Sequence, residues 1–371
     1  MAITIKNPTL LARSDHFFKS LKSSDRIALL HDTDPDGTTS GKIIVEALKQ
    51  IGCLTKLFLI TERKEHFISD EKITLMKQHN INILITTDKT VDSGPEQIKK
   101  IEQFAHIVVF DHHIIEHDIQ SEKTIFLKPQ LLFDGVPPDR YCSAKLSYDI
   151  LSRVTNLSHL DWICAVGVIG DMAYPAWPEF MNSVYKKYNI PIQPNQNPID
   201  TSLGMVTQLI SFAESLGEAE HCFDLILKSN TIEHATKNLQ QYSIVKQELE
   251  HYITNAEKTV EKYNNNQLII YEINSKYKIK SMLSTALSQR LYLNKTLIIV
   301  QQIDKEMTIS ARRQDCKKNM NTLLKTALGS LNGNAGGHAP ASGASVLVKD
   351  YPEFKKRLIE SEQKKEIEIN I

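Results

Sequence analysis

Apolar and polar positions alternate in blocks through roughly the first 130 residues of the chain. Short apolar runs of the kind that form strands cover residues 26–31, 54–61, 81–87, 106–110 and 124–128. Between these runs, apolar residues recur at helical spacing over residues 41–51, 70–78 and 95–104. Apolar strands that alternate with helices of about ten residues are typical of βαβ units, whose parallel sheet is buried on both faces. The pattern therefore predicts a parallel sheet flanked by helices.

The rest of the chain changes character twice. From Cys142 to about Gly217 the pattern is helical, with a Pro- and Asn-rich surface loop at residues 190–198. Residues 231 to about 263 then predict one long amphipathic helix, which we interpret as a connection between two domains rather than as a coiled-coil partner. Beyond it we expect strands at residues 267–273, 296–303 and 307–311 and helices at residues 281–293, 320–328 and 353–365.

These elements predict an α/β protein of two domains. We expect an N-terminal parallel-sheet domain over residues 1–228, a connecting helix over residues 229–265 and a smaller C-terminal α/β domain over residues 266–371. A length of 371 residues is ample for two domains that each bury a core.

Charge is balanced over the whole chain but not along it. The chain has 44 Lys and Arg against 44 Asp and Glu, whereas residues 266–371 have 17 against 10, a net charge of +7. A basic C-terminal third joined to an acidic body indicates one part that attracts anions and another that holds cations, although solvated surface charge would give the same counts.

The spacing of the cysteines and the hydropathy of the chain narrow the classes of protein that fit this sequence. The 5 Cys are scattered and form no Cys-x-x-Cys pair, so we expect neither a disulfide framework nor a zinc knuckle. The longest apolar run, Trp162–Gly170, is too short to cross a bilayer, and the first residues lack the pattern of a signal peptide. The expectation is a cytoplasmic protein with no membrane partner.

Acidic and imidazole side chains follow the predicted strands of the first domain at the points where those strands end. An additional acid follows the helical run at residues 165–170. In sequence order these residues are Asp32, Asp34, Asp36, Asp88, Asp111, His112, His113 and Asp171. Because the carboxyl ends of parallel strands share one edge of a sheet, where ligands bind, we expect these side chains to meet in one crevice.

So many carboxylates cannot stay ionised together without a compensating cation. Mixed Asp and His ligation suits manganese better than magnesium alone, and we predict metal ligands among Asp32, Asp34, Asp36, Asp88, Asp111, His112 and Asp171. Two such ions about 3.5–4 Å apart activate water and stabilise the leaving oxygen of a phosphate ester. Each acid alone could be a turn or cap residue, but their shared position at strand ends favours metal-assisted hydrolysis of a phosphoester or phosphoanhydride. The Cys residues lie outside this predicted group, which argues against a thiol nucleophile.

The C-terminal domain contains two features that suit phosphate. Residues 333–343 are dense in glycine, including Gly336 and Gly337, so that bare backbone N–H groups could cradle phosphate oxygens. The predicted strand from Thr308 ends in the adjacent arginines Arg312 and Arg313. A mobile turn and solvated edge charges would explain each feature separately, but together in the basic third they favour a phosphate-holding surface.

These motifs resemble a known family. The segment 32–40, Asp88, the Asp111-His112-His113 triplet and Gly170-Asp171 resemble, in order, the four motifs of the DHH phosphoesterase superfamily. The segments Gly336-Gly337-His338 and Ser310-Ala311-Arg312 resemble its DHH-associated C-terminal domain of the first type. The resemblance spans most of the chain.

The resemblance implies that the first domain binds two Mn²⁺ ions, with Mg²⁺ or Co²⁺ as substitutes, and that substrate enters an active site in the cleft between the domains. It makes Asp111 a bridging or supporting residue, and Asp32 and His113 either ligands or supports of ligands. The implied first-line ligands are Asp34, Asp36, Asp88, His112 and Asp171. The implied catalytic group is Asp36, Asp111, His112 and His113, and the implied substrate-binding group is Ser310, Arg312, Arg313, Gly336, Gly337 and His338.

The motifs also depart from the family pattern. The three-aspartate first motif is more similar to the RecJ exonuclease branch than to the pyrophosphatases, and His31 is out of register for a ligand. The glycine that RecJ-like proteins have soon after the second-motif acid is replaced by residues 89–94, so Asp92 competes with Asp88 for that role. Arg313 stands where a small residue is common, and the chain is too short for the additional oligonucleotide-binding domain of full bacterial RecJ enzymes.

The sequence thus predicts a manganese-dependent, RecJ-like exonuclease that removes nucleotides from single-stranded DNA or short oligonucleotides. The balanced overall charge argues against tight wrapping of long duplex and favours single strands or short oligonucleotides as partners. The alternatives are a small-nucleotide phosphatase or cyclic-dinucleotide phosphodiesterase, a non-catalytic nucleic-acid-binding DHH relic, and, disfavoured by the Gly-Gly-His segment, an inorganic pyrophosphatase. The sequence does not decide between DNA and RNA as substrates, and it does not identify a protein partner.

Overall fold

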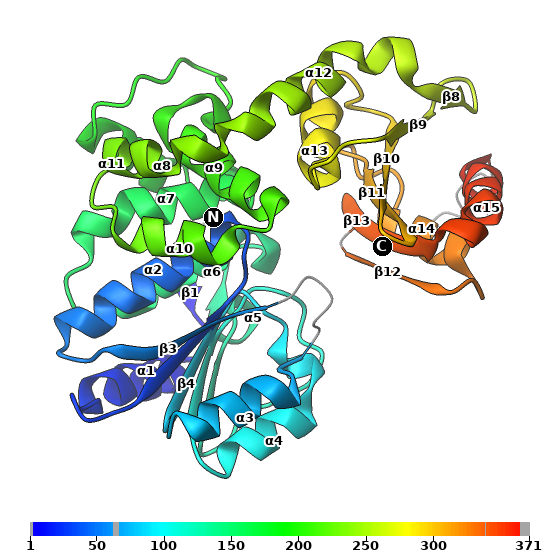
Figure 1. Ribbon diagram of the computed structural model, residues 1–371. Coiled ribbons are helices and arrows are strands. Elements are labelled where there is room, and N and C mark those ends of the chain that lie inside the picture. Colours follow the sequence, from blue (N-terminus) through cyan, green and yellow to red (C-terminus); the bar gives the residue numbers. More distant parts are fainter. Residues whose placement is uncertain (1–2, 62–66, 338, 364–371) are drawn as a thin grey trace. The chain divides into compact units, whose positions relative to one another are not determined.

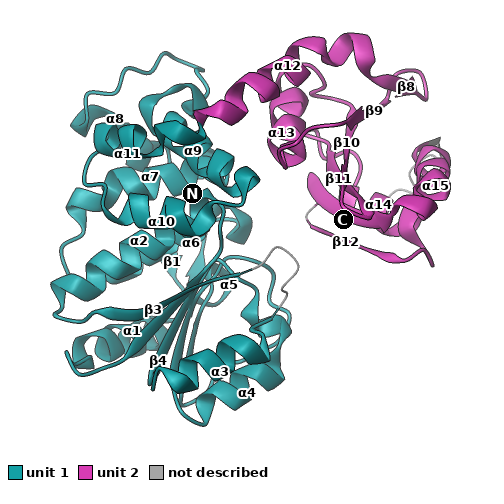
Figure 2. Cartoon of the chain, viewed as in Figure 1, with its two compact units in different colours: residues 1–242 teal, residues 243–371 magenta. Residues whose placement is uncertain are grey.

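The computed structural model describes residues 3–61, 67–337 and 339–363. The chain forms two compact units, Met1–Tyr242 and Ser243–Ile371, shown in Figures 1 and 2. Each unit contains its own sheet and its own hydrophobic core. No helix within the described ranges has both the length and the apolar character needed to span a bilayer.

Unit 1 is built on a five-stranded parallel sheet with the strand order β3-β2-β4-β5-β6. Its strands are β2 (Ile27–His31), β3 (Thr55–Ile60), β4 (Ile83–Thr87), β5 (His106–Phe110) and β6 (Thr124–Leu127). Residues of β2, β4 and β6 are buried throughout, as expected for a parallel sheet covered on both faces. The predicted parallel sheet is confirmed.

Helices on one face of this sheet close one apolar core of unit 1. Side chains of α3 (Asp70–Gln78) and α4 (Pro95–Glu102) pack with inward-facing strand residues in one buried apolar cluster. Figure 1 shows these two helices side by side. The helix predicted at residues 41–51 is longer than expected, because α2 (Pro35–Gln50) begins where Asp34 caps it and Pro35 occupies its first turn.

The second half of unit 1 is helical. Its helices are α6 (Ser143–Leu151), α7 (Asp161–Gly170), α8 (Pro178–Lys187), α9 (Ser202–Leu216), α10 (Ala219–Leu227) and α11 (Ile232–Leu239). Helix α7 is buried over almost its whole length and packs against α2 and α6. A Cβ atom on Gly167 would lie 2.4 Å from Thr39 Oγ1 and 2.5 Å from Ala144 Cβ, so only glycine permits this approach of the three helices.

Short elements complete unit 1. Strand β1 (Thr4–Ile5) pairs with β7 (Phe133–Asp134). The remaining helices are α1 (Pro8–Ser20), α5 (Pro129–Leu132) and the 3₁₀ turns η1 (Val91–Ser93), η2 (Pro138–Arg140), η3 (Ser158–Leu160), η4 (Tyr174–Ala176) and η5 (Pro198–Asp200).

The long helical stretch predicted before the second unit is present, with two differences. It consists of α11, the 3₁₀ turn η6 (Gln240–Ser243) and α12 (Ile244–Thr259). Residues Glu261–Tyr263 form strand β8 instead of a last helical turn, because Val260 is extended and β8 pairs with β9. The long-range strand pairing therefore outweighs the local helical pattern here.

Unit 2 contains a six-stranded mixed sheet with the strand order β12-β13-β11-β10-β9-β8. Its strands after β8 are β9 (Leu268–Ile273), β10 (Thr296–Ile303), β11 (Glu306–Arg312), β12 (Gly333–Gly337) and β13 (Ala341–Leu347). Its helices are α13 (Lys280–Arg290), α14 (Met320–Leu328), α15 (Tyr351–Gln363) and the turn η7 (Val348–Asp350). Helices α14 and α15 pack against one face of the sheet, where the core of this unit lies.

The predicted strands and helices of the C-terminal α/β unit are present. The glycine-dense segment differs from the expected phosphate-cradling loop, because Gly333–Gly337 forms the edge strand β12, paired antiparallel with β13. A Cβ atom on Gly333 would lie 2.0 Å from the carbonyl oxygen of Ser345, so glycine at this position lets the two strands approach.

Candidate metal centre

The first turn of α2 directs a buried carboxylate toward a neighbouring helix. Asp36 follows the Asp34 cap, whose Oδ1 accepts a hydrogen bond from Gly37 N at 2.9 Å. Its own oxygens accept from Ser143 N at 2.7 Å and Ala144 N at 2.9 Å, at the start of α6. The N-terminal N–H groups of a helix favour an anion, so this contact both orients Asp36 and joins α2 to α6.

A left-handed turn places the next acid. Asp88 directly follows β4 and has φ +59°, a conformation that Asp tolerates better than most residues. Its backbone N–H donates to the carbonyl of Phe110 at 2.9 Å, which ties the ends of β4 and β5 together. Its Oδ1 accepts from Ser143 Oγ at 3.0 Å and lies 3.4 Å from His112 Nε2.

His112 lies between two carboxylates from distant segments. Its Nε2 faces Asp88, and its Nδ1 is 3.7 Å from Oδ2 of Asp171 at the end of α7. Neither Nδ1 of His112 nor Oδ2 of Asp171 has a hydrogen-bond partner among the described residues, although both atoms are buried. Buried polar atoms are normally satisfied, and a divalent cation held by imidazole and carboxylate would satisfy both.

Two groups of side chains have the spacing of metal ligands. Ligand atoms of Asp88, His112 and His113 lie within 4.8 Å of one another, and so do those of Asp36, Cys142 and Asp171. The donor types are those of a site for borderline divalent ions, so the residues fit the metal centre that the sequence implies. The buried Cys142 corrects our expectation that all cysteines lie outside the acid cluster.

Asp111 has cationic or hydrogen-bonding partners on both carboxylate oxygens. Its Oδ1 lies 2.7 Å from His113 Nδ1, and its Oδ2 lies 2.8 Å from the ammonium of Lys128. The side chains of Asp111 and Lys128 are completely buried. Of the two roles that the sequence left open for Asp111, this geometry favours support over ligation of a metal.

The alternative second-motif acid, Asp92, points elsewhere. Its Oδ2 accepts from Glu116 N at 2.7 Å, and its Oδ1 lies 3.2 Å from Lys128 Nζ. It belongs to neither group of closely spaced ligand atoms. The geometry therefore favours Asp88, the strand-end residue, for the metal-binding role.

Asp32 and His31 lie at the margin of the cluster. Oδ1 of Asp32 accepts from Thr33 N at 2.7 Å and from Thr61 Oγ1 at 3.3 Å. His31 stacks on Phe223 with ring centroids 4.0 Å apart, and its Nδ1 lies 2.7 Å from the carbonyl of Asp32. His31 is therefore held in the core and belongs to neither group of closely spaced ligand atoms.

The electrostatics of the cluster show how strongly it requires positive charge. Burial, reinforced by the charge of Asp88, raises the pKa of Asp34 and Asp36 well above the usual carboxyl range. Burial likewise raises the pKa of Asp171 to about 6. Burial opposes charge on His112, but Asp171 and Asp88 outweigh it and raise the pKa of this imidazole well above its ordinary value. Without a metal, protons on these groups are what balance the acids.

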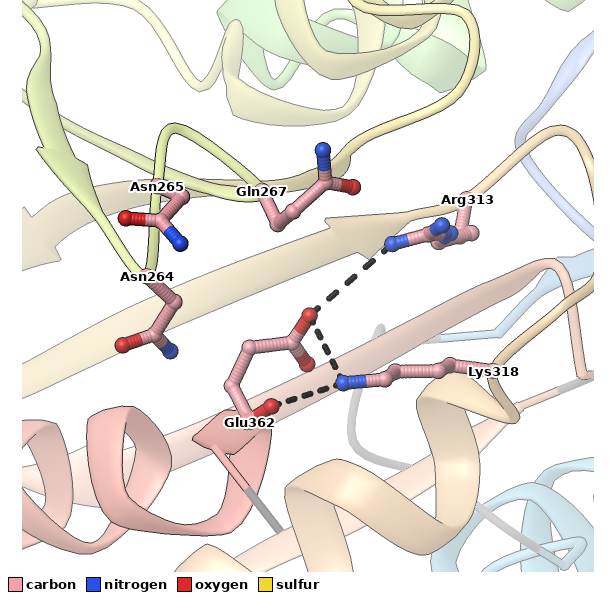
Figure 3. A pocket seen from close by; sticks show the side chains of 6 residues that line it. All are labelled: Asn264, Asn265, Gln267, Arg313, Lys318 and Glu362. Atoms are coloured by element: carbon pink, nitrogen blue, oxygen red, sulfur yellow. Dashed lines mark hydrogen bonds and ion pairs between the residues drawn. The ribbon is translucent and has the colours of Figure 1, made fainter. Parts of the chain in front are cut away.

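The predicted substrate residues of unit 2 divide between two faces of the sheet. Along β11, Ser310 contacts Ser284 of α13 through hydroxyls 2.8 Å apart, and Arg312 follows on the same face by the two-residue period of a strand. Arg313 lies on the other face, 2.8 Å from Asp315 and 3.8 Å from Glu362 of α15. Figure 3 shows the ion pair of Arg313 with Glu362 beside Lys318, among the residues that line a cavity of about 480 Å³. The expectation that both arginines form one phosphate surface is therefore wrong, because adjacent residues point to opposite faces.

The other predicted substrate residues are at the sheet edge. Gly336 and Gly337 belong to β12, and Gly337 has φ +129°, which requires glycine. No hydrogen bond or ion pair holds the guanidinium of Arg312 among the residues that the structure describes, and burial lowers its pKa to about 10. His338 lies outside the described residues.

Family comparisons agree with this arrangement. Residues 26–172 match the DHH family N-terminal domain, and residues 265–364 match the DHHA1 domain. The chain combines a DHH family N-terminal domain with a DHHA1 domain. Within the DHH family domain, the closely spaced Asp and His ligand atoms form a candidate site for divalent metal.

Solved structures share the fold of this DHH protein. RecJ from Thermus thermophilus, in complex with Mn²⁺, gives a TM-score of 0.70 at 16% identity over 96% of this chain and 55% of that chain. An exonuclease RecJ bound to manganese gives 0.67 at 18% identity over 98% and 96% of the two chains. A pGpG-specific phosphodiesterase from Vibrio cholerae gives 0.53 at 12% identity over 91% and 98%. Identities this low show similarity of fold alone.

One sequence relative covers a shorter part of the DHH protein. An uncharacterized protein of Methanocaldococcus jannaschii is 28% identical over 152 residues, which are 40% of this chain and 33% of that protein. The match thus spans about a third of that relative, and the chain spans about half of Thermus thermophilus RecJ.

Three residues of the site escaped the sequence analysis. Cys142 and Ser143 precede or begin a helix, and nothing in their local pattern indicates which carboxylates they meet. Lys128 follows β6 directly, so a search of strand ends for cations as well as acids would have found it.

Proposed function

We propose that this DHH protein is a manganese-dependent phosphodiesterase that acts as a RecJ-like exonuclease on single-stranded nucleic acid or short oligonucleotides. The observation that carries the proposal is the convergence of Asp36, Asp88, His112 and Asp171 from separate ends of strands and helices. Among the described residues, His112 Nδ1 and Asp171 Oδ2 face each other without a hydrogen-bond partner. The similarity of fold to RecJ, which extends over almost the whole chain, supports it.

The proposed metal-binding residues are Asp34, Asp36, Asp88, His112 and Asp171, with Cys142 beside Asp36 and Asp171 and with Asp32 at the margin. When bound by these residues, two Mn²⁺ ions would supply Lewis acidity and an activated water for attack on phosphorus. Backbone N–H groups of Ser143 and Ala144 hold Asp36, and the hydroxyl of Ser143 holds Asp88, so both carboxylates are oriented in advance.

Asp111 and His113 would act beside the metal ligands. The 2.7 Å contact to Asp111 fixes the ring of His113 and, with burial opposing it, raises the pKa of that imidazole. A protonated, oriented imidazole suits a hydrogen bond to a phosphate oxygen as negative charge develops there. In unit 2, Arg312 and the β12 edge with Gly336 and Gly337 would supply the contacts to the substrate's other phosphates.

A second candidate is a phosphodiesterase restricted to dinucleotides. The similarity of fold to a pGpG-specific enzyme favours it, as does a chain with no net charge, which gains little from long polyanions. The two candidates share the same centre and differ in the length of strand that they accept.

One experiment separates them. End-labelled single-stranded DNA and RNA of several lengths, together with pGpG, are incubated with the protein and Mn²⁺, and the products are resolved on gels. Stepwise shortening of long strands supports the exonuclease, whereas turnover confined to pGpG supports the second candidate. Asp36→Asn should abolish either activity, and Asp70→Asn, at an exposed acid of α3, is the matched control. No Mn²⁺-dependent product from wild-type protein on any of these substrates would refute both candidates.

A further inference from the structure

A fully buried ammonium group lies against the DHH triplet. Lys128 Nζ is 2.8 Å from Asp111 Oδ2 and 3.2 Å from Asp92 Oδ1. It also donates to the carbonyls of His113 and Ile114, at 3.1 Å each. Lys128 directly follows β6, while its partners follow β4 and β5, so one side chain connects the ends of three neighbouring strands.

This contact continues toward the metal centre. The Asp111 oxygen that does not face Lys128 lies 2.7 Å from His113 Nδ1. His113 in turn shares a group of closely spaced ligand atoms with Asp88 and His112. A continuous path of polar contacts therefore leads from Lys128 through Asp111 to the centre.

The position of Lys128 also determines what Asp111 can do. A cation 2.8 Å from one oxygen repels a second cation at the same carboxylate, and His113 occupies the other oxygen. Lys128 thus keeps Asp111 out of the ligand set and leaves it to orient His113. Asp92 contacts the same ammonium and shares its charge.

We propose that Lys128 is a positioning residue for the phosphoesterase reaction, acting through Asp111 on the orientation of His113. The expected effect of Lys128 on turnover rests on the proposed function. The proposal distinguishes Lys128 from a lysine that merely stabilises the fold, because its loss should lower turnover without lowering the affinity for metal.

Replacing Lys128 by Met removes a positive charge next to the centre and leaves Asp111 uncompensated. Mn²⁺ affinity should therefore be unchanged or increased, while kcat falls about 10–100-fold because His113 loses its orientation. Lys128→Arg keeps the charge and should retain kcat within about tenfold of wild type, since geometry alone changes. If Lys128→Met folds poorly, Lys128→Met combined with Asp92→Asn removes one of the two uncompensated charges and serves in its place.

Lys42 provides a matched control. It is a second fully buried lysine of unit 1, and its ammonium donates to the carbonyls of Ile226 and Leu227 at 3.0 and 3.2 Å. Lys42→Met should therefore lower the melting temperature without a selective loss of kcat.

The experiment measures five quantities on the full chain. They are the melting temperature, the Mn²⁺ affinity by calorimetry, kcat and KM on whichever substrate the wild type cleaves, and the imidazole Nδ1–H signal of His113 in the metal-free protein. A lowered kcat with retained Mn²⁺ affinity and a lost His113 signal supports the proposal. Parallel loss of metal affinity, stability and kcat, or an unchanged His113 signal, overturns it. If the wild type cleaves nothing, the proposed function fails, and the His113 signal and Mn²⁺ affinity still decide whether Lys128 positions the triplet.

Discussion

Ser143 joins two acids of the metal centre, since its hydroxyl donates to Asp88 at 3.0 Å while its backbone N–H donates to Asp36 at 2.7 Å. The acids belong to segments that are 52 residues apart in the chain, after β2 and after β4. One residue at the start of α6 therefore sets the relative position of two proposed ligands.

Ser143→Ala should weaken metal binding without unfolding the protein. The substitution removes the hydroxyl contact to Asp88 but keeps the N–H contact to Asp36, and loss of a group that orients a ligand typically costs about 10–100-fold in affinity. Calorimetric titration with Mn²⁺ measures this change. The control is Ser147→Ala, one turn later in the same helix, where the buried hydroxyl has no hydrogen-bond partner in the described part of the chain. Equal Mn²⁺ affinity of the two variants would contradict the role of Ser143.

The two adjacent arginines of unit 2 should respond differently to removal. Arg313→Ala breaks a buried ion pair with Asp315 and Glu362 and should destabilise the protein by about 3 kcal/mol. Arg312→Ala should leave the denaturation midpoint nearly unchanged and raise KM roughly tenfold or more, because a charge-assisted hydrogen bond to phosphate is worth about 1.5–3 kcal/mol. Chemical denaturation measures the first effect and steady-state kinetics the second. A loss of stability in Arg312→Ala together with a raised KM in Arg313→Ala would contradict these roles.

Metal-free protein should lose stability as the pH rises above about 6.5. The pKa of His112 is raised well above its ordinary value because nearby carboxylates outweigh its burial, so the folded state holds a proton that the unfolded state releases. This contribution of His112 to stability is fully present below the pKa that the imidazole has in the unfolded state. It is lost as the pH rises through the pKa that the imidazole has in the folded state. Burial lowers the pKa of His31 to about 4. This residue therefore makes stability rise with pH, but only below the ordinary pKa of an imidazole.

Melting temperatures of EDTA-treated protein between pH 6.5 and about pH 8.5 test this sign, with a limiting slope of about 1.4 kcal/mol per pH unit for each proton. Mn²⁺ should raise the melting temperature, and the increase should grow with pH because the metal displaces those protons. His112→Gln should flatten the metal-free slope. A metal-free stability that rises over this range would contradict the charge assignment.

Alkylation should distinguish one cysteine from the other four. Cys316 is exposed, whereas Cys53, Cys142, Cys164 and Cys222 are buried. Burial raises the pKa of the Cys142 and Cys164 thiols well above their ordinary range, and for Cys142 the carboxylates of Asp36 and Asp171 add to this effect. Brief treatment of native protein with iodoacetamide, followed by peptide mass spectrometry, should therefore show modification at Cys316 alone. Rapid modification of Cys142 would contradict its burial in the centre.

The local pattern of apolar and polar residues was sufficient to predict most strands and helices of unit 1. It was not sufficient for strands and side-chain contacts whose partners lie far away in the chain. The strand at residues 106–110 and the helix at residues 70–78 have the predicted bounds, because apolar periodicity and caps act over a few residues. The edge strand β12 and the short strand β8 were missed, since both exist through pairing with strands elsewhere in the chain. The sequence grouped Arg313 with Arg312 in one phosphate surface, but Arg313 pairs with Glu362 of α15, a partner that only the tertiary structure supplies.

The sequence by itself determined that this protein has a parallel sheet with acids and histidines gathered at one edge. Chain order suffices for that conclusion, because parallel strands present their carboxyl ends together. Only the tertiary structure decided which acid does what: Asp88 faces His112, Asp92 and Asp111 face Lys128, and Cys142 lies among the carboxylates. These roles depend on partners from distant segments, whose approach is set by packing such as that of Gly167 against α2 and α6 and not by any local pattern.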